Sequence, residues 1–227
     1  MTFNPITEAG RRIAPLVDHT LLKPEATEAQ VVSLCTEARH YGFAAVCVNP
    51  SLLGLVVRET RGSGVKACTV VGFPLGAVPG ETKAFEADRY AQAGAHELDM
   101  VLAIGLLKDK NYPAVSADIS GVVKAAGAGR IVKVILETHL LTGAEKIAAC
   151  QIAAEAGARF VKTSTGFTGG GATEEDVRLM RQTVGPRLGV KASGGIRTLE
   201  AAERMIRAGA NRIGTSSGVA IVTAGTQ

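Results

Sequence analysis

The 227-residue sequence has no tryptophan, and its six phenylalanines and three tyrosines make up only 4% of the chain. With so little aromatic volume, we expect a core of Ala, Val, Ile and Leu in which backbones pack closely. The 27 glycines follow no Gly-X-Y period, which excludes a collagen-like chain. A hydrophobic fraction of 46% and a charged fraction of 20% exclude a disordered one.

The four cysteines form no C-x-x-C pair, so the sequence predicts neither a zinc ribbon nor a thioredoxin-like redox pair. Free thiols in a chain of this length favour a cytoplasmic location. A membrane-spanning helix needs about 18 apolar residues in a row, and no apolar run approaches that length. The first residues do not resemble a signal peptide. We therefore expect no membrane contact. The net charge is +4, but the basic residues form no continuous block, so we also expect no nucleic-acid partner. A small positive charge is compatible with binding an anionic metabolite.

Short apolar or β-branched runs alternate with amphipathic stretches of helical length. The predicted strands lie within residues 13–22, 44–49, 66–73, 96–103, 130–137, 160–165, 189–195 and 212–218. The predicted helices cover residues 27–41, 50–61, 81–94, 109–127, 142–157, 173–185 and 198–209. This alternation is typical of a parallel sheet buried on both faces. Eight strands favour an α/β fold, a single (β/α)8 TIM barrel over residues 1–227, with a doubly wound open sheet as the alternative.

Local signals set the expected ends of these elements. Helix-capping residues are predicted at Thr27, Ser51, Thr142 and Thr198. Left-handed helix stops are predicted at Gly94, Gly157 and Gly209. Residues 1–12 are expected to form an extension or a short helix that plugs the barrel base or lies free. The segment after Gly218 is short for a full eighth helix.

Polar residues interrupt the apolar strands at positions that alternation turns into the barrel. These inward positions include Asp18, Cys47, Glu97, Asp99, Lys133, Lys162 and Lys191. A single lysine in a strand more often pairs with a carboxylate or reaches solvent. Several buried charges together are costly without a network, and they mark candidate sites.

Paired inward lysines suggest a particular chemistry. Two cations about 4 Å apart repel by about 4 kcal/mol at an effective dielectric constant of about 20. A lysine beside a second cation is therefore more easily a neutral amine, and a neutral amine attacks carbonyls to form Schiff bases. From this spacing we hypothesise imine chemistry in the mouth of the barrel.

Glycine-rich loops follow the last three predicted strands, namely GFTGGG at 166–171, Ser193-Gly194-Gly195, and Gly214 with Thr215-Ser216-Ser217-Gly218. Each run alone could be a tight turn. Because (β/α)8 enzymes commonly hold phosphate in these late loops, three such runs together predict a phosphate cradle. None of them is a Walker A loop or a dinucleotide fingerprint, so neither ATP nor NAD is implied.

Eight motifs, in order along nearly the whole chain, resemble deoxyribose-phosphate aldolase, the class I aldolase of the DeoC type. They are DHTLLKPEAT (18–27), CVNP (47–50), TVVGFPLG (69–76), ELDMV (97–101), KVILET (133–138), VKTSTGF (161–167), KASGGIR (191–197) and IGTSSG (213–218). The resemblance implies a lyase of nucleoside catabolism that reversibly cleaves 2-deoxy-D-ribose 5-phosphate to D-glyceraldehyde 3-phosphate and acetaldehyde. It also implies a homodimer and no metal or organic cofactor.

The resemblance assigns roles to single residues. Lys162 would be the Schiff-base lysine, Lys191 the neighbouring cation that favours its neutral amine, and Asp99 the group that moves protons through a water. Asp18, Cys47 and Lys133 would line the same pocket. The phosphate cradle would be Thr165, Gly166, Gly194, Gly195, Gly214, Ser216 and Ser217.

One family feature is missing from the sequence. Some relatives end in a tail whose terminal Tyr assists proton transfer, whereas this sequence ends in TAGTQ with no Tyr after Tyr112. We therefore expect Asp99 with water to carry more of that step.

Three other functions remain open at this point. A metal-dependent aldolase would need clustered ligands, yet the four histidines show no H-x-x-x-H-type spacing. A phosphosugar isomerase would share the cradle but use a Glu base, and a non-catalytic metabolite-binding barrel would need no Lys162.

Overall fold

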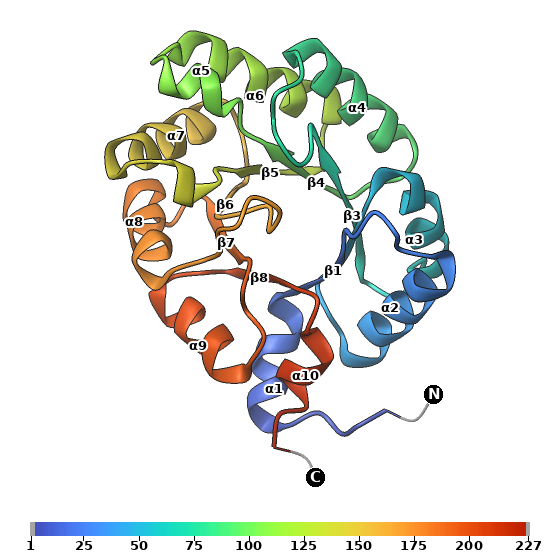
Figure 1. Ribbon diagram of the computed structural model, residues 1–227. Coiled ribbons are helices and arrows are strands. Elements are labelled where there is room, and N and C mark those ends of the chain that lie inside the picture. Colours follow the sequence, from blue (N-terminus) through green and yellow to red (C-terminus); the bar gives the residue numbers. More distant parts are fainter. Residues whose placement is uncertain (1–2, 226–227) are drawn as a thin grey trace.

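The computed structural model describes residues 3–225. Residues 1–2 of the N-terminal segment and residues 226–227 of the C-terminal TAGTQ lie outside the described residues. Eight parallel strands close into a barrel in the order β1 to β8, with β8 pairing back onto β1, and helices surround it (Figure 1). The predicted (β/α)8 barrel is confirmed, and the open-sheet alternative is wrong. The strands are β1 Val17–Leu21, β2 Ala45–Val48, β3 Lys66–Val71, β4 Glu97–Val101, β5 Ile131–Ile135, β6 Phe160–Lys162, β7 Gly189–Ser193 and β8 Arg212–Thr215.

The outer layer is helical, and its main members follow the predicted ranges. They are α2 Glu28–Tyr41, α3 Leu53–Glu59, α4 Gly80–Gln92, α6 Tyr112–Ala126, α7 Gly143–Glu155, α8 Glu174–Val184 and α9 Leu199–Ala208. Thr27 and Thr142 begin α2 and α7 with capping boxes, in which the N3 residue bonds back to the cap. Thr198 caps α9 through the N–H of Ala201.

Two local predictions differ from the structure. Ser51 is not a helix cap, because it lies inside the 3₁₀ turn η2 (Pro50–Leu52), and α3 begins only after Leu52. The short helix α5 (Ile104–Lys108) was not predicted. Five mostly apolar residues next to a strand are too few to show a helical period, so they fall between the predicted strand at 96–103 and the predicted helix at 109–127.

The N-terminal helix α1 (Glu8–Ile13) is followed by the 3₁₀ turn η1 (Ala14–Leu16) and packs against α10 (Gly218–Val222), the last helix. The N–H of Thr7 donates to the carbonyl of Val222 at 3.0 Å. A Cβ on Gly10 would lie 2.0 Å from that carbonyl oxygen, so only glycine permits the approach. In Figure 1, α1 and α10 lie side by side between α9 and α2, so together they complete the outer layer where α10 alone is short.

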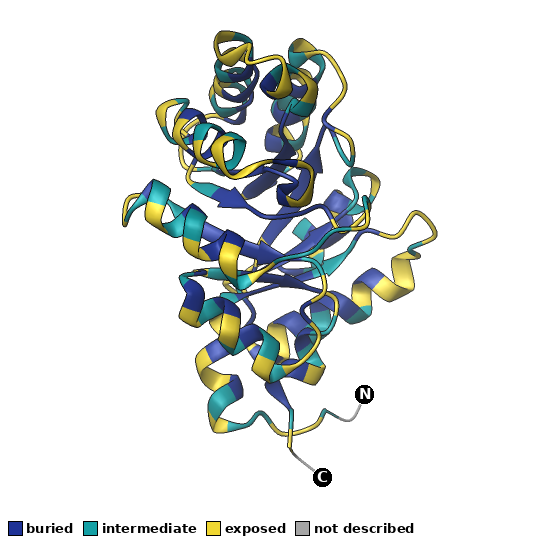
Figure 2. Ribbon diagram, turned by 60° about the vertical axis from the view of Figure 1, so that its left-hand side comes forward, coloured by how far each residue is buried: buried dark blue, intermediate teal, exposed yellow. Residues whose placement is uncertain are grey.

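The barrel interior divides into an apolar and a charged part. A small cluster of Leu22, Ala45, Cys47, Cys68 and Val70 fills the β2–β3 side. The larger apolar core lies between the sheet and the helices, whose outer faces are exposed (Figure 2). Many of its helical members are alanines, which lets helices pack closely on a small barrel. Within residues 3–225, no helix combines the length and apolarity needed to cross a bilayer.

Candidate active site

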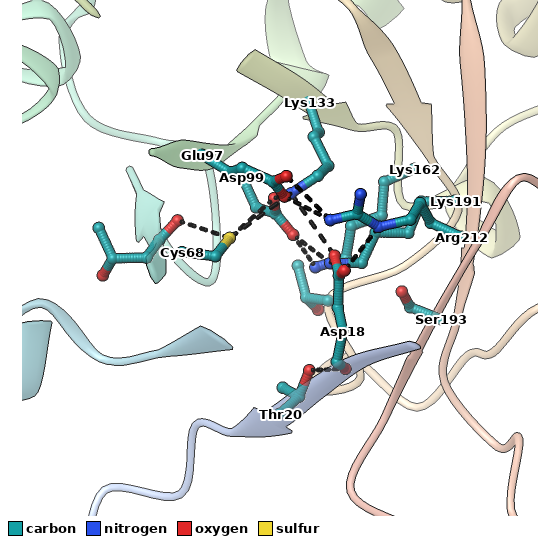
Figure 3. Close-up of polar contacts among 12 residues, drawn as sticks. Asp18, Thr20, Cys68, Glu97, Asp99, Lys133, Lys162, Lys191, Ser193 and Arg212 are labelled. Carbon is teal, nitrogen blue, oxygen red and sulfur yellow. Dashed lines mark hydrogen bonds and ion pairs between the residues drawn. The ribbon is translucent and has the colours of Figure 1, made fainter. Parts of the chain in front are cut away.

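Seven charged side chains meet inside the barrel, next to Cys68 of the apolar interior cluster (Figure 3). They are Asp18 on β1, Glu97 and Asp99 on β4, Lys133 on β5, Lys162 on β6, Lys191 on β7 and Arg212 on β8. All except Arg212 are buried. Strand register brings them together, because Asp99 pairs with Lys133 and Lys162 pairs with Lys191 on adjacent strands. The inward direction predicted from alternation is therefore correct for six of them, all except Arg212.

Asp99 is the centre of this charged cluster. Its Oδ1 lies 2.7 Å from the Nζ of Lys133, and its Oδ2 lies 2.9 Å from Lys162 and 2.8 Å from Lys191. Burial raises the pKa of the Asp99 carboxyl, but the three lysines outweigh it and hold that pKa well below its usual range. Asp99 is thus a carboxylate at neutral pH, within hydrogen-bond reach of three amines.

Lys191 and Lys133 are each held by more than one carboxylate. The Nζ of Lys191 lies 2.5 Å from Asp18 and 2.8 Å from Asp99, and that of Lys133 lies 2.6 Å from Glu97. Burial lowers the pKa of each of these lysines, yet the surrounding carboxylates raise it above its ordinary value. Both lysines therefore remain ammonium ions near neutral pH.

Arg212, the first residue of β8, completes the cluster. It was not among the inward residues predicted from the sequence. Its Nε lies 2.7 Å from Asp18, and its Nη2 lies 2.9 and 2.8 Å from the two oxygens of Glu97. Burial opposes the charge on the guanidinium, but the two carboxylates raise the pKa of Arg212. The period of two points to it, because Arg212 lies two residues before Gly214, where a Cβ would meet the inward side chains of Ser193 and Lys191.

Two cysteines border the cluster on its apolar side. Cys47 pairs with Cys68 across β2 and β3, and the Sγ of Cys68 lies 3.3 Å from Asp99 Oδ1. A hydrogen bond from Cys68 lowers the pKa of the Cys47 thiol although burial opposes it, whereas burial raises that of Cys68. The ligand atoms of Cys47, Cys68 and Asp99 lie within 4.8 Å of one another, a spacing that a soft metal ion could accept. The ammonium of Lys133 already contacts this group, 3.5 Å from Cys68, so a metal would have to displace it.

A cavity of about 380 Å³ lies at the carboxyl ends of the strands, above the cluster. The predicted residues that line it are Lys162, Thr165, Gly166, Gly194, Gly195, Gly214 and Ser216. The predicted residues Asp18, Cys47, Asp99, Lys133 and Lys191 do not line it and are buried beneath it. Ser217 instead lines a neighbouring cavity together with His19 and Glu37. Lys162 is thus the member of the charged cluster that reaches the cavity.

The glycine-rich loops form one wall of this cavity. Gly166, Gly194 and Gly195 have φ angles of +85°, +90° and +79°, which side chains rarely adopt. A Cβ on Gly194 would lie 2.9 Å from the Cα of Gly171, so the loops after β6 and β7 touch through backbone alone. In the described chain, the N–H groups of Gly166, Gly195 and Ser216 donate to no protein partner.

Cations flank the same wall, because Lys23 and Arg197 also line the cavity. Free backbone donors with nearby cations form a surface that suits an anion. This geometry supports the cradle predicted from the glycine runs.

Sequence reasoning also missed Glu137, a buried carboxylate just after β5 that accepts from the N–H of Thr165 at 3.2 Å. Its φ of +58° is unusual for a residue with a side chain and could not be read from the strand pattern.

Comparisons with known proteins show which family the chain belongs to. The family model described as DeoC/LacD family aldolase matches residues 12–224. The chain is 60% identical to the deoxyribose-phosphate aldolase of Halalkalibacterium halodurans, over 94% of this chain and 96% of the relative. It is 59% identical to the deoxyribose-phosphate aldolase of a Geobacillus strain, over 92% of this chain and 94% of the relative. The tetrameric deoxyribose phosphate aldolase structure from Aeropyrum pernix superposes with a TM-score of 0.88 at 40% identity, covering 94% of this chain and 90% of that one.

These relatives confirm the resemblance seen in the eight motifs, and the matched region contains every charged residue of the interior cluster. The chain therefore belongs to the DeoC/LacD family of aldolases, and it is a lyase.

Proposed function

We propose that this enzyme is a class I aldolase that reversibly cleaves 2-deoxy-D-ribose 5-phosphate to D-glyceraldehyde 3-phosphate and acetaldehyde. The observation that carries the proposal is the position of Lys162. Its Nζ contacts Asp99 at 2.9 Å, and its side chain lines the cavity below the glycine-rich loops. One amine therefore reaches both a buried carboxylate and the space where a phosphosugar would fit.

The charge balance of the cluster favours Lys162 as the nucleophile. The cluster holds three carboxylates and four basic groups, so it is electrically balanced when one basic group is neutral. Lys162 contacts one carboxylate, whereas Lys133 contacts three, and Lys191 and Arg212 contact two each. The least-paired amine loses the least attraction when it gives up its proton. Lys162 is therefore the amine of the cluster that carboxylates hold least.

The proposed cycle begins when the Lys162 amine adds to the carbon 1 aldehyde of the open-chain sugar. The adduct takes up a proton and loses water to give a protonated imine, which can accept the electron pair of the bond between carbons 2 and 3. Asp99, acting through a water, takes the proton of the carbon 3 hydroxyl, and the bond between carbons 2 and 3 breaks. D-glyceraldehyde 3-phosphate leaves, the enamine takes a proton on carbon 2, and hydrolysis releases acetaldehyde and restores Lys162.

The phosphate in this proposal lies against Gly166, Gly194, Gly195, Gly214 and Ser216. It is remote from the bond that breaks, so its binding energy positions the reacting carbons. Lys23 and Arg197, which line the same cavity, add attraction for a dianion.

Borohydride reduction in the presence of acetaldehyde tests the proposal directly. We expect a stable ethyl adduct on Lys162, found by mass spectrometry of peptides, absent from Lys162→Ala and unchanged by EDTA. A metal-dependent aldolase would be inhibited by EDTA and would give no adduct. A phosphosugar isomerase or a non-catalytic barrel would also give none, and the isomerase would turn over phosphosugars without forming acetaldehyde.

The proposal also includes a homodimer acting in the cytoplasm. The Aeropyrum pernix relative is tetrameric, so the state of this chain needs its own measurement. Light scattering of the purified enzyme should give twice the chain mass of 23.4 kDa, and a fourfold mass would replace the dimer by a tetramer.

A further inference from the structure

The side chain of Ser193, at the end of β7, points into the barrel beside the charged cluster (Figure 3). The residue is buried and lines the cavity, yet its Oγ has no hydrogen-bond partner within residues 3–225. A buried hydroxyl without a partner is costly, and such groups in cavities often meet a ligand. Ser193 therefore has hydrogen-bonding capacity aimed at whatever fills the cavity.

Neighbouring residues hold this hydroxyl in place. The N–H of Ser193 donates to the Oγ1 of Thr163 at 3.0 Å, and that hydroxyl donates to the carbonyl of Ser193 at 3.0 Å. On the other side, a Cβ on Gly214 would lie 2.3 Å from the Ser193 Oγ. Thr163 thus fixes the backbone, and Gly214 leaves the space that the hydroxyl occupies. This is the rigid support that a recognition group requires.

Ser193 stands between the two ends of the site. Two residues earlier on the same face is Lys191, which contacts Asp99, and the next residue is Gly194 of the cradle. A substrate bound to Lys162 through carbon 1, with its phosphate in the loops, would present its middle hydroxyls to this position. The hydroxyl on carbon 4 neighbours the phosphate-bearing carbon, as Ser193 neighbours the cradle.

We infer that Ser193 is a specificity-determining residue whose hydroxyl binds the carbon 4 hydroxyl of the substrate. The inference rests on the proposed function. Carbon 4 becomes carbon 2 of D-glyceraldehyde 3-phosphate, so Ser193 favours acceptor aldehydes that carry a hydroxyl next to the carbonyl. A site with a fixed hydrogen-bonding group discriminates against analogues that lack its partner.

The test is aldol addition of acetaldehyde to two acceptors that differ only in this hydroxyl, D-glyceraldehyde 3-phosphate and 3-oxopropyl phosphate. In Ser193→Ala we expect kcat/KM to fall by about two- to tenfold with the first acceptor and to stay level with the second. The preference of the wild-type enzyme for the hydroxylated acceptor should shrink by the same factor.

Ser164→Ala is the matched control. Ser164 is also buried with an unpartnered hydroxyl, but it does not line the cavity, so its loss should leave the preference between the two acceptors intact. Equal losses with both acceptors in Ser193→Ala, or no loss with either, would overturn the inference. If the wild-type enzyme gave product with neither acceptor, the proposed function itself would fail.

Discussion

Glu137, just after β5, accepts hydrogen bonds from both the N–H and the hydroxyl of Thr165. The Thr165 oxygen in turn accepts from the N–H of Phe167 at 3.1 Å. The only proton of that hydroxyl is therefore committed to Glu137, and the side chain of Thr165 fixes the loop after β6. A phosphate in the cradle would then be met by backbone N–H groups such as that of Gly166.

Glu137→Gln should weaken binding of the phosphate end of the substrate. The amide keeps the shape of the side chain but carries no charge, so the bonds to Thr165 weaken and the loop loses its support. We expect a several-fold higher KM for 2-deoxy-D-ribose 5-phosphate. Turnover of unphosphorylated 2-deoxy-D-ribose, which makes no use of the loop, is the comparison. Equal losses with both sugars would assign Glu137 to general stability instead.

Lys191→Leu should raise the pH at which activity appears. Without Lys191 the cluster has three carboxylates and three basic groups, so it is balanced with Lys162 protonated. The neutral amine needed for imine formation then requires a higher pH. We expect the rising limb of the pH profile of kcat/KM to move up by about one pH unit or more.

Lys191→Arg keeps the positive charge and is the matched variant for this measurement. Its rising limb should lie closer to that of the wild-type enzyme than the limb of Lys191→Leu does. Identical profiles for Lys191→Leu and the wild type would remove Lys191 from this role.

The barrel and most of its charged interior follow from simple periodicities. Near-continuous apolar strands separated by helical stretches predict a parallel barrel, and alternation along each strand places Asp99, Lys133, Lys162 and Lys191 inside. Interior positions are set by backbone geometry alone, so they can be read from one sequence. The loops after the last strands could be predicted because glycine tolerates the φ angles that they adopt.

The remainder depends on contacts that no local pattern encodes. The support of Thr165 by Glu137 joins residues 28 positions apart and needs a left-handed conformation at Glu137. The bond from Arg212 to Asp18 joins the two ends of the chain and exists only when the barrel closes. The location of Ser217 in a neighbouring cavity is decided by the turn of the loop after β8, which the sequence motif does not specify.

Asp18→Asn should destabilise the fold at neutral pH and reduce its sensitivity to acid. Burial raises the pKa of Asp18, but Lys191, Lys133 and Arg212 lower it overall. A carboxyl with a lowered folded-state pKa contributes stability above its usual value of about 3.9, and that contribution is lost as the pH falls toward the folded-state value. Replacing the Asp18 carboxylate by an amide leaves Lys191 and Arg212 each with one carboxylate fewer. We expect the free energy of unfolding at pH 7 to fall by about 3–5 kcal/mol.

Urea denaturation at several pH values measures both effects. Below about pH 4 the slope of unfolding free energy against pH should be smaller in Asp18→Asn by about 1.4 kcal/mol per pH unit, the contribution of one proton. An unchanged slope would mean that Asp18 titrates alike in the folded and unfolded chain.

Cys47 should be the thiol through which reactive aldehydes inactivate the enzyme. Its pKa is lowered by the hydrogen bond from Cys68, and a thiolate adds to unsaturated aldehydes formed when acetaldehyde condenses with itself. We expect Cys47→Met to survive longer than the wild type in excess acetaldehyde, measured as residual cleavage activity over time. Cys150→Ser is the control, because burial raises the pKa of that thiol to about 12 and its loss should not prolong survival. Equal survival of Cys47→Met and the wild type would assign the inactivation to another group.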